Sequence, residues 1–413
     1  MKKMTDKSYK WFALVLVWGS VMFQQGIRQI YGATLPSIAS TFRVSSVEIG
    51  LVGTVFMFVY GFMMLCSGFL SDKFSRKWIL VCGIALYSAG GFLSGYVSCV
   101  GALVITYGII SALGQPLVFP PGTALLMQLH GEETRATALS IVQSALYVGI
   151  VLCAVGSGCL AELESDGWRS AFKLAGALAL VWALVTAVAM RDTRVEATSC
   201  TKVSLKDALR AVFVKKSAIL YAIYLIILNG VTIGFTIWTP SFVMDAFPHL
   251  SKGMAVLHAV LWMNAGALIG VILGGKIGDR FALARQGVRM EILAVGVFGC
   301  GIAWFFVARS AALFGCCLSL TACGFFRGIL DSNFNVSLFD VIKPRYHASA
   351  LGFMLGMSYV FGAIAPIFLG WMREHFSLRT GLMTFPGFYF AALVLILISR
   401  YRYYLKDKES AGA

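Results

Sequence analysis

The stretch CGFFRGILDSNFNVSLFD, residues 323–340, lies within a long apolar segment and yet carries four strongly polar side chains, Arg327, Asp331, Asn333 and Asn335. A charged side chain at the centre of a bilayer costs roughly 3 kcal/mol on insertion scales, and it persists only where it faces other helices or water. Arg327 and Asp331 are four residues apart, so a helix places them on one face, where they partly neutralise each other. The stretch therefore predicts a helix that forms one wall of a polar cavity inside a membrane protein.

The composition supports a membrane protein. Of the 413 residues, 59% are hydrophobic and 13% are charged, whereas a soluble domain has about 25% charged residues. The net charge of +15 does not indicate nucleic-acid binding, because the basic residues lie between apolar segments and not in one patch. The ten cysteines show neither metal-ligand spacing nor a disulfide framework. The sequence has no metal motif, phosphate-binding loop or nucleophile–base pattern, so we expect neither an enzyme nor a cofactor.

Apolar segments long enough to cross a bilayer occur about twelve times. A polar interval, residues 191–216, separates six of them from the other six. This arrangement predicts an all-α membrane protein with two six-helix bundles, residues 1–190 and 217–413, joined by a cytoplasmic linker in which residues 204–214 form a surface helix. The expected spans are residues 11–36, 47–70, 78–98, 101–127, 136–160, 169–190, 217–240, 253–275, 288–308, 311–341, 347–371 and 380–400.

The charge distribution predicts the orientation in the membrane. The basic start MKKMTDKSYK (1–10) leads into an apolar run that Gln24, Gln25 and Arg28 interrupt, with no small-residue cleavage site after it. We therefore expect a retained first span and not a cleaved signal peptide. Most of the 34 lysines and arginines fall on the side that carries both termini. The positive-inside rule then predicts a multi-pass protein of the cytoplasmic (inner) membrane with both termini in the cytoplasm.

The two halves of the chain repeat each other. RATALSIVQSALYVG (135–149) matches HASALGFMLGMSYVFG (347–362), GFLSDK (68–73) matches GKIGDR (275–280), and TLPS (34–37) matches WTPS (238–241). A parallel duplication of a six-helix unit is an architecture in which the substrate site forms between the halves near the middle of the membrane.

The loop GFLSDKFSRK (68–77) and its copy at 275–280 resemble the signature of the major facilitator superfamily, a glycine and an aspartate followed by basic residues. With the twelve spans and the duplication, the resemblance covers essentially the whole chain. It implies alternating access by rocking of the two halves, driven by an ion or counter-substrate gradient. Ser75 stands where the family usually has glycine, which leaves the shape of the turn open.

Five charged residues are expected to form a cytoplasmic gate: Asp72, Arg76, Arg135, Asp279 and Arg280. The two aspartates can each face a helix N-terminus of the opposite half, where the helix dipole favours an anion. The basic residues of the loop would lie at the lipid headgroups. The alternative is that these loops only fix the topology.

The resemblance also implies that the first, fourth, seventh and tenth spans line the central cavity, and the polar residues within the membrane fall on these spans. Gln24, Arg28 and Tyr31 follow an i, i+4, i+7 spacing, which is one helix face. The expected substrate-binding residues are Gln24, Arg28, Tyr31, Gln115, Asn229, Trp238, Arg327, Asn333 and Asn335. Aromatic residues such as Trp238 and Tyr31 are equally typical of helix packing.

Arg28 and Arg327 come from different halves, and two guanidinium groups facing one cavity would bind a carboxylate or a phosphate. This resembles the sugar-acid symporters and organophosphate antiporters of the superfamily, in which an arginine of the first span binds the anion. Thr232, not an arginine, aligns with Arg28 in the second half, so Arg327 has to supply the second charge. The alternative for Arg28 is a structural arginine paired with Asp331 or with carbonyl groups.

Asp331 is the only carboxylate well inside an expected span. If the substrate displaces Arg327, Asp331 can accept a proton and couple proton entry to substrate entry; the alternative is a permanent Arg327–Asp331 pair. We therefore expect a monomeric secondary carrier in the lipid bilayer that takes up a small organic anion, such as a sugar acid, with protons. An organophosphate:phosphate antiporter, a neutral-sugar symporter and a transporter-derived sensor remain alternatives.

Overall fold

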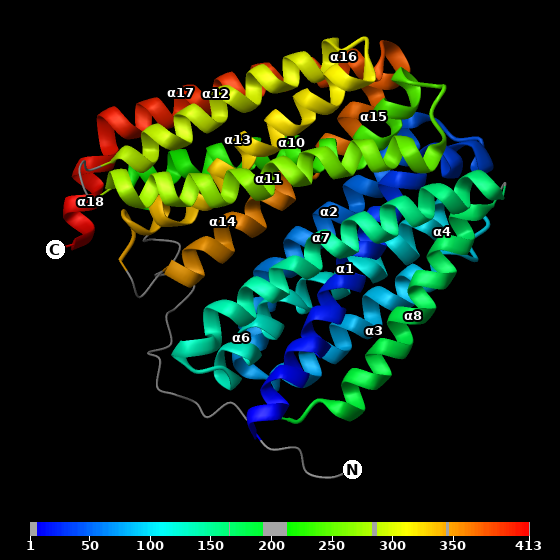
Figure 1. Ribbon diagram of the computed structural model, residues 1–413, viewed down its shortest axis with the longest axis horizontal. Coiled ribbons are helices and arrows are strands. Elements are labelled where there is room, and N and C mark those ends of the chain that lie inside the picture. Colours follow the sequence, from blue (N-terminus) through cyan, green and yellow to red (C-terminus); the bar gives the residue numbers. More distant parts are fainter. Residues whose placement is uncertain (1–5, 165, 193–212, 283–286, 344–346, 413) are drawn as a thin grey trace. The chain divides into compact units, whose positions relative to one another are not determined.

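A computed structural model describes residues 6–164, 166–192, 213–282, 287–343 and 347–412. All regular secondary structure among these residues is helical (Figure 1). The chain divides into two compact units. The first unit comprises residues 1–198, 236–244 and 248–257, and the second comprises residues 199–235, 245–247 and 258–413. The predicted surface helix at 204–214 lies almost entirely outside the described residues.

The helices follow the predicted spans to within a few residues at most ends. Those up to residue 189 are α1 Asp6–Phe42, α2 Ser46–Lys73, α3 Arg76–Ser94, the segmented helix Val100–Leu129, α7 Glu132–Leu163 and α8 Gly167–Ala189. Those after residue 215 are α10 Lys216–Ala246, α11 Lys252–Ala282, α12 Val288–Arg309, α13 Leu313–Phe339, α14 His347–Gly362, α15 Ala365–His375, α16 Leu378–Leu382, α17 Phe385–Ile398, η4 Ser399–Tyr404 and α18 Leu405–Gly412.

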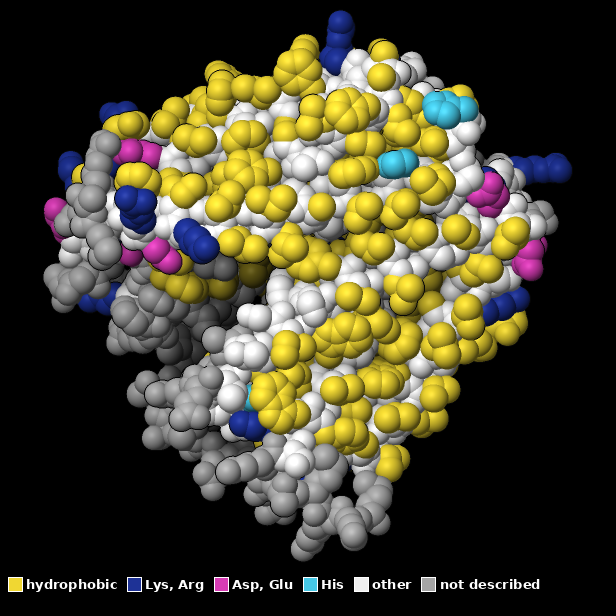
Figure 2. Space-filling view, in the orientation of Figure 1, with side chains coloured by type: hydrophobic (Ala, Val, Ile, Leu, Met, Phe, Trp, Pro, Cys, Tyr) yellow, Lys and Arg dark blue, Asp and Glu magenta, His cyan; other side chains and the backbone are white. Residues whose placement is uncertain are grey.

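Eleven helices in the described part of the chain are long and apolar enough to cross a membrane. With α1, which carries Lys10, Arg28 and three glutamines, they make the twelve predicted spans. Large apolar side chains such as Leu184, Val188 and Phe390 are well exposed on these helices. On the face drawn in Figure 2, apolar side chains cover the length of the helices while most charged ones lie toward the helix ends. This surface suits lipid as the solvent.

The fourth span is broken into five pieces: α4 Val100–Leu103, the π-helical η1 Val104–Ser111, α5 Ala112–Gly114, the 3₁₀ turn η2 Gln115–Leu117 and α6 Phe119–Leu129. Pro116, Pro120 and Pro121 lie at these breaks, and each lacks the N–H that an α-helix needs. The carbonyl of Gln115 accepts hydrogen bonds from the Val118 N–H at 3.2 Å and from the Gln24 amide of α1 at 2.5 Å. The break therefore joins the fourth span to α1.

Glycines allow the closest helix contacts. α1 packs along α7, and a Cβ placed on Gly149 of α7 would lie 2.1 Å from the carbonyl oxygen of Met22. The second unit has an equivalent contact, in which a Cβ on Gly324 of α13 would lie 1.9 Å from the carbonyl oxygen of Met263 on α11. Helix backbones that approach this closely are typical of membrane proteins, in which small residues form the interfaces.

Replacing Gly149 by alanine tests this packing. We expect Gly149→Ala to lower the stability of the folded protein by about 1–3 kcal/mol, because the new methyl group meets a backbone carbonyl that has to move. Gly156→Ala on the same helix is the matched control, since its Cβ meets nothing within 4 Å, and alanine favours a helix by up to about 1 kcal/mol over glycine. Thermal unfolding in detergent measures both, and equal melting temperatures for the two variants would contradict the assignment.

Candidate functional site

In the first unit, Arg28 of α1 lies over aromatic rings of α2. Its guanidinium carbon is 4.9 Å from the ring centroid of Tyr60 and 5.9 Å from that of Phe56. Its Nη2 lies 3.3 Å from the sulfur of Met57. The side chain is part-buried, so these contacts place a cation at the interior of an apolar bundle and leave some of its surface open. Cation–π contacts of this kind contribute about 0.5–2 kcal/mol each when partly desolvated.

A column of stacked rings supports this arginine. Phe56 stacks on Tyr107 of η1 at 4.6 Å, and Tyr107 stacks on Tyr31 of α1 at 4.9 Å. The hydroxyl of Tyr107 donates to the carbonyl of Arg28 itself at 3.1 Å. The hydroxyl of Tyr31 donates to the carbonyl of Ile49. Tyr31, which the sequence predicted as a substrate contact, is completely buried and holds the ring column against α2.

Gln24 and Gln115, both predicted to bind substrate, lie together in the interior of the first unit. Gln24 uses its amide nitrogen on the Gln115 carbonyl. Both residues are at most 1% exposed. Among the residues that the structure describes, the side-chain oxygen of Gln24 and both polar side-chain atoms of Gln115 have no hydrogen-bond partner. Buried amides normally have partners, so this pair provides unused donors and acceptors one helix turn from Arg28.

In the second unit, Arg327 and Asp331 form the ion pair that their spacing on α13 predicted. The Arg327 Nε lies 2.9 Å from the Asp331 Oδ1. The Arg327 Nη1 donates to the hydroxyl of Thr232 on α10, which in turn donates to the carbonyl of Leu228 at 2.7 Å. The Asp331 side chain is 51% exposed and that of Arg327 is 20% exposed. The pair is therefore held from one side by α10, while the carboxylate remains accessible.

The other predicted polar residues of the second unit have packing partners. The Asn229 amide donates to the Ser358 hydroxyl of α14 at 2.6 Å. Asn333 is fully buried, and its amide nitrogen donates to the carbonyls of Gly274 on α11 and Ile329 on α13, each at 3.0 Å. Trp238 of α10, which belongs to the first unit, is fully buried. The side chain of Asn335 lies outside the described part of the structure.

The signature loop of the second unit has a physical role that the sequence did not predict. Arg289, at the start of α12, donates from Nη2 to Asp279 at 2.6 Å and from Nη1 to the side-chain oxygen of Asn333 at 3.3 Å. A Cβ on Gly278 would lie 2.2 Å from that oxygen, so a larger residue there would displace the Asn333 side chain. The motif therefore links α11, α12 and α13 within one unit.

The corresponding loop of the first unit contacts the fourth span. The Arg76 Nη1 donates to the Ala124 carbonyl of α6 at 3.3 Å. The side chains of Asp72 and Arg135 lie outside the described residues, and Arg280 is exposed. The gating role of these five residues remains a prediction. Among the residues that the structure describes, no three potential metal ligands come together.

Sequence reasoning missed Phe56, Tyr60 and Tyr107, which hold Arg28, and Arg289, which holds Asn333. Phe56 and Tyr60 could have been found from the sequence, because they are four residues apart and a helix therefore places both rings on one face of a span. Arg289 has no such signal, since it is a basic residue at the start of a span with no regular spacing to Asn333.

The family model of the Major Facilitator Superfamily matches residues 17–321 and again residues 264–413. The chain belongs to this superfamily. It is a membrane transporter and not an enzyme.

Several relatives and solved structures resemble most of the chain. A probable sulfoacetate transporter, SauU of Cupriavidus necator, is 24% identical over 376 residues, which is 87% of this chain and 85% of that protein. The hexuronate transporter of Bacillus subtilis is 22% identical over 399 residues, 90% of each chain. Among solved structures, a bacterial homologue of the human lysosomal transporter Spinster, in an inward-facing and occupied conformation, has a TM-score of 0.82 at 17% identity, covering 97% of this chain and 98% of its own.

Asn333→Ala tests whether this residue packs helices or binds substrate. We expect the variant to lose about 1–3 kcal/mol of stability, because the Gly274 carbonyl and one Arg289 N–H lose their partner inside the unit. Asn264→Ala is the control, since the Asn264 amide is only part-buried and bonds within its own helix to Val260. Thermal unfolding in detergent measures the effect. An unchanged melting temperature together with the loss of ligand-induced stabilisation would instead support the substrate contact.

Proposed function

We propose that the protein takes up a small organic anion, a sugar acid or a similar carboxylate, with protons across the cytoplasmic membrane, with both termini in the cytoplasm. The observation that carries the proposal is the part-buried guanidinium of Arg28, which the rings of Phe56 and Tyr60 hold inside an apolar bundle. Removing a charged side chain from water to that depth costs free energy. Charged residues that proteins keep within the membrane despite this cost commonly mark substrate pathways. Three relatives, named as a probable sulfoacetate transporter, a hexuronate transporter and a benzoate transport protein, are consistent with an anionic substrate.

Arg28 and Arg327 both bind the acidic group of the substrate in this proposal. A guanidinium matches a carboxylate with two parallel hydrogen bonds, and such charge-assisted bonds are about twice as strong as neutral ones. Arg28 contacts the ring faces of Phe56 and Tyr60 and the thioether of Met57, and a carboxylate binds a guanidinium more strongly than ring faces or a thioether do. Gln115, with both polar side-chain atoms unpartnered, and the oxygen of Gln24 would bind hydroxyl groups of the same molecule.

Proton coupling through Asp331 follows from its pairing with Arg327. When the substrate anion takes over the Arg327 guanidinium, the Asp331 carboxylate loses its counter-charge inside the membrane. Protonation from the aqueous side then removes the cost of an unpaired charge. Its 51% exposed side chain is accessible to that proton. Substrate entry and proton entry would thereby occur together, and the proton would leave when Arg327 returns.

The first test is a thermal-shift screen of the purified protein with glucuronate, succinate, glucose 6-phosphate and glucose. We expect at least one of the acids to raise the melting temperature by a few degrees, as a ligand does at concentrations well above its Kd. Glucose should leave the melting temperature unchanged. Arg28→Ala should abolish the shift, while Arg402→Ala, an exposed arginine of η4, should retain it. Stabilisation of Arg28→Ala equal to that of the wild type would exclude Arg28 as an anion ligand.

The second test concerns the coupling ion. In proteoliposomes, uptake of the acid found in the screen should follow an imposed proton gradient for the wild type. Asp331→Asn cannot change its charge, so its transport should reduce to exchange that no longer responds to that gradient. Uptake by Asp331→Asn that still depends fully on the proton gradient would exclude this carboxylate as the coupling site.

A second candidate function is exchange of an organophosphate for phosphate. A probable hexose phosphate transport protein of Chlamydia trachomatis is 21% identical to this chain over 194 residues, which is 46% of this chain and 42% of that protein. Counterflow of glucose 6-phosphate driven by internal phosphate without a proton gradient would favour this function over proton symport.

A further inference from the structure

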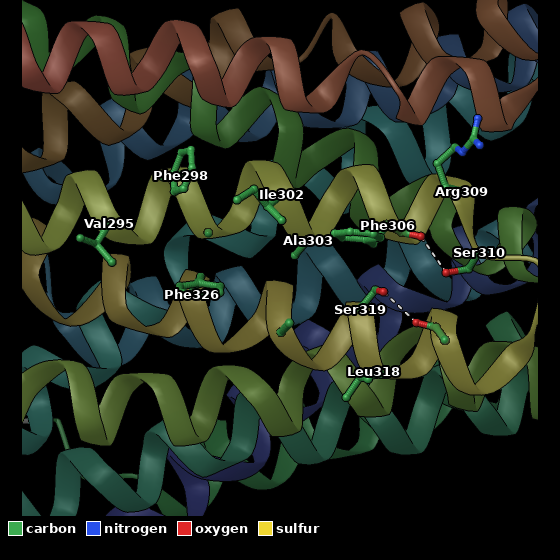
Figure 3. A pocket seen from close by; sticks show the side chains of 13 residues that line it. Val295, Phe298, Ile302, Ala303, Phe306, Arg309, Ser310, Leu318, Ser319 and Phe326 are labelled. Atoms are coloured by element: carbon green, nitrogen blue, oxygen red, sulfur yellow. Dashed lines mark hydrogen bonds between the residues drawn. The ribbon is translucent and has the colours of Figure 1, made fainter.

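A groove on the outer surface of the second unit runs between α12 and α13 (Figure 3). Its volume is about 590 Å³. Phe298, Ile302 and Phe306 of α12 line one side, and Leu318 and Phe326 of α13 line the other. None of these residues belongs to the proposed transport site.

The groove faces the surroundings of the protein. Phe298 is 58% exposed and Leu318 is 60% exposed. From Val295 to Ser310 the groove follows α12 for about 22 Å at ~1.5 Å per residue. The hydrocarbon core of a bilayer is about 30 Å thick, so the groove is longer than one leaflet. In a membrane-spanning chain, a groove of this length with apolar walls has the dimensions to hold a lipid acyl chain.

One end of the groove is basic. Arg309, in the last turn of α12, lines the groove at the end opposite Val295 (Figure 3) and is exposed. A second guanidinium reaches the same place, because the Arg379 Nη2 donates to the carbonyl of Ser310 at 3.3 Å. The hydroxyls of Ser310 and Ser319 bond to carbonyls of their own helices, so they add polarity without competing for the arginines.

Two other surface grooves of the unit lack this feature. One lies between α10, α14, α15 and α17, with a volume of about 270 Å³, and the other lies between α12 and α17, with a volume of about 410 Å³. Within the described residues, no charged side chain lines either of them. The combination of an acyl-sized apolar groove with a cation at its end therefore distinguishes the α12–α13 groove from its neighbours.

We propose that the α12–α13 groove binds a phospholipid with an anionic headgroup, such as phosphatidylglycerol. One acyl chain lies along Phe298, Ile302 and Leu318, and the headgroup phosphate bonds to Arg309 with Arg379 beside it. Guanidinium groups bind phosphate through bidentate charge-assisted bonds. A second positive charge nearby favours a headgroup with net negative charge over a zwitterionic one.

Native mass spectrometry of the purified protein tests the proposal, with phosphatidylglycerol and phosphatidylcholine of identical acyl chains as probes. We expect the first bound phosphatidylglycerol to have a lower apparent Kd than phosphatidylcholine. Arg309→Gln should weaken phosphatidylglycerol binding by about fivefold, which corresponds to about 1 kcal/mol for one basic residue near an anionic headgroup. Arg402→Gln, which removes an exposed arginine distant in sequence from the groove, should leave the Kd unchanged.

A second variant keeps the charge and removes the groove. Ala322 of α13 lines it, and Ala322→Phe should fill it and weaken binding of both lipids. The proposal is overturned if phosphatidylcholine binds as tightly as phosphatidylglycerol, if Arg309→Gln and Arg402→Gln bind alike, or if Ala322→Phe retains the first lipid.

Discussion

A guanidinium group within a bilayer has to be surrounded by protein, because lipid tails offer it neither water nor hydrogen-bond acceptors. Arg28 and Arg327, which both lie within described spans, meet this constraint in different ways. Arg327 has a carboxylate four residues away and a threonine hydroxyl on the neighbouring helix. Arg28 has the faces of two rings and a sulfur atom. The two environments suit two roles in the proposed site, since an ion pair can exchange partners while the ring platform positions the cation by cation–π contacts.

The platform depends on how the first unit folds. Tyr31, Tyr107 and Phe56 come from three different spans and stack in one column, and the hydroxyl of Tyr107 bonds to the backbone of Arg28. The column requires α1 to approach both α2 and the broken fourth span closely. The fourth span is broken next to its prolines, and at this break the Gln24 amide of α1 donates to the Gln115 carbonyl. The position of the cation is thus a property of the whole unit and not of α1 alone.

Local features of the chain were predictable and long-range ones were not. Hydropathy places the spans, since lipid selects apolar runs of about twenty residues, and helical periodicity predicts the Arg327–Asp331 pair. The partners of Arg28 and Asn333 depend on contacts between distant segments, which one sequence does not encode in any simple spacing. A polar residue in an apolar helix has two uses, helix packing and substrate binding. Tyr31, Asn229 and Asn333 use polar side-chain atoms in hydrogen bonds to neighbouring helices. Gln115 has two polar side-chain atoms without a partner among the described residues.

The most direct measurement is an experimental structure of the purified protein with the stabilising acid bound. The account predicts that the acidic group of this ligand lies within hydrogen-bond distance, about 2.7–2.9 Å, of guanidinium nitrogens of both Arg28 and Arg327, with Asp331 released from its pair. A ligand bound elsewhere, with Arg28 still resting on Phe56 and Tyr60 and Arg327 still paired with Asp331, would contradict it.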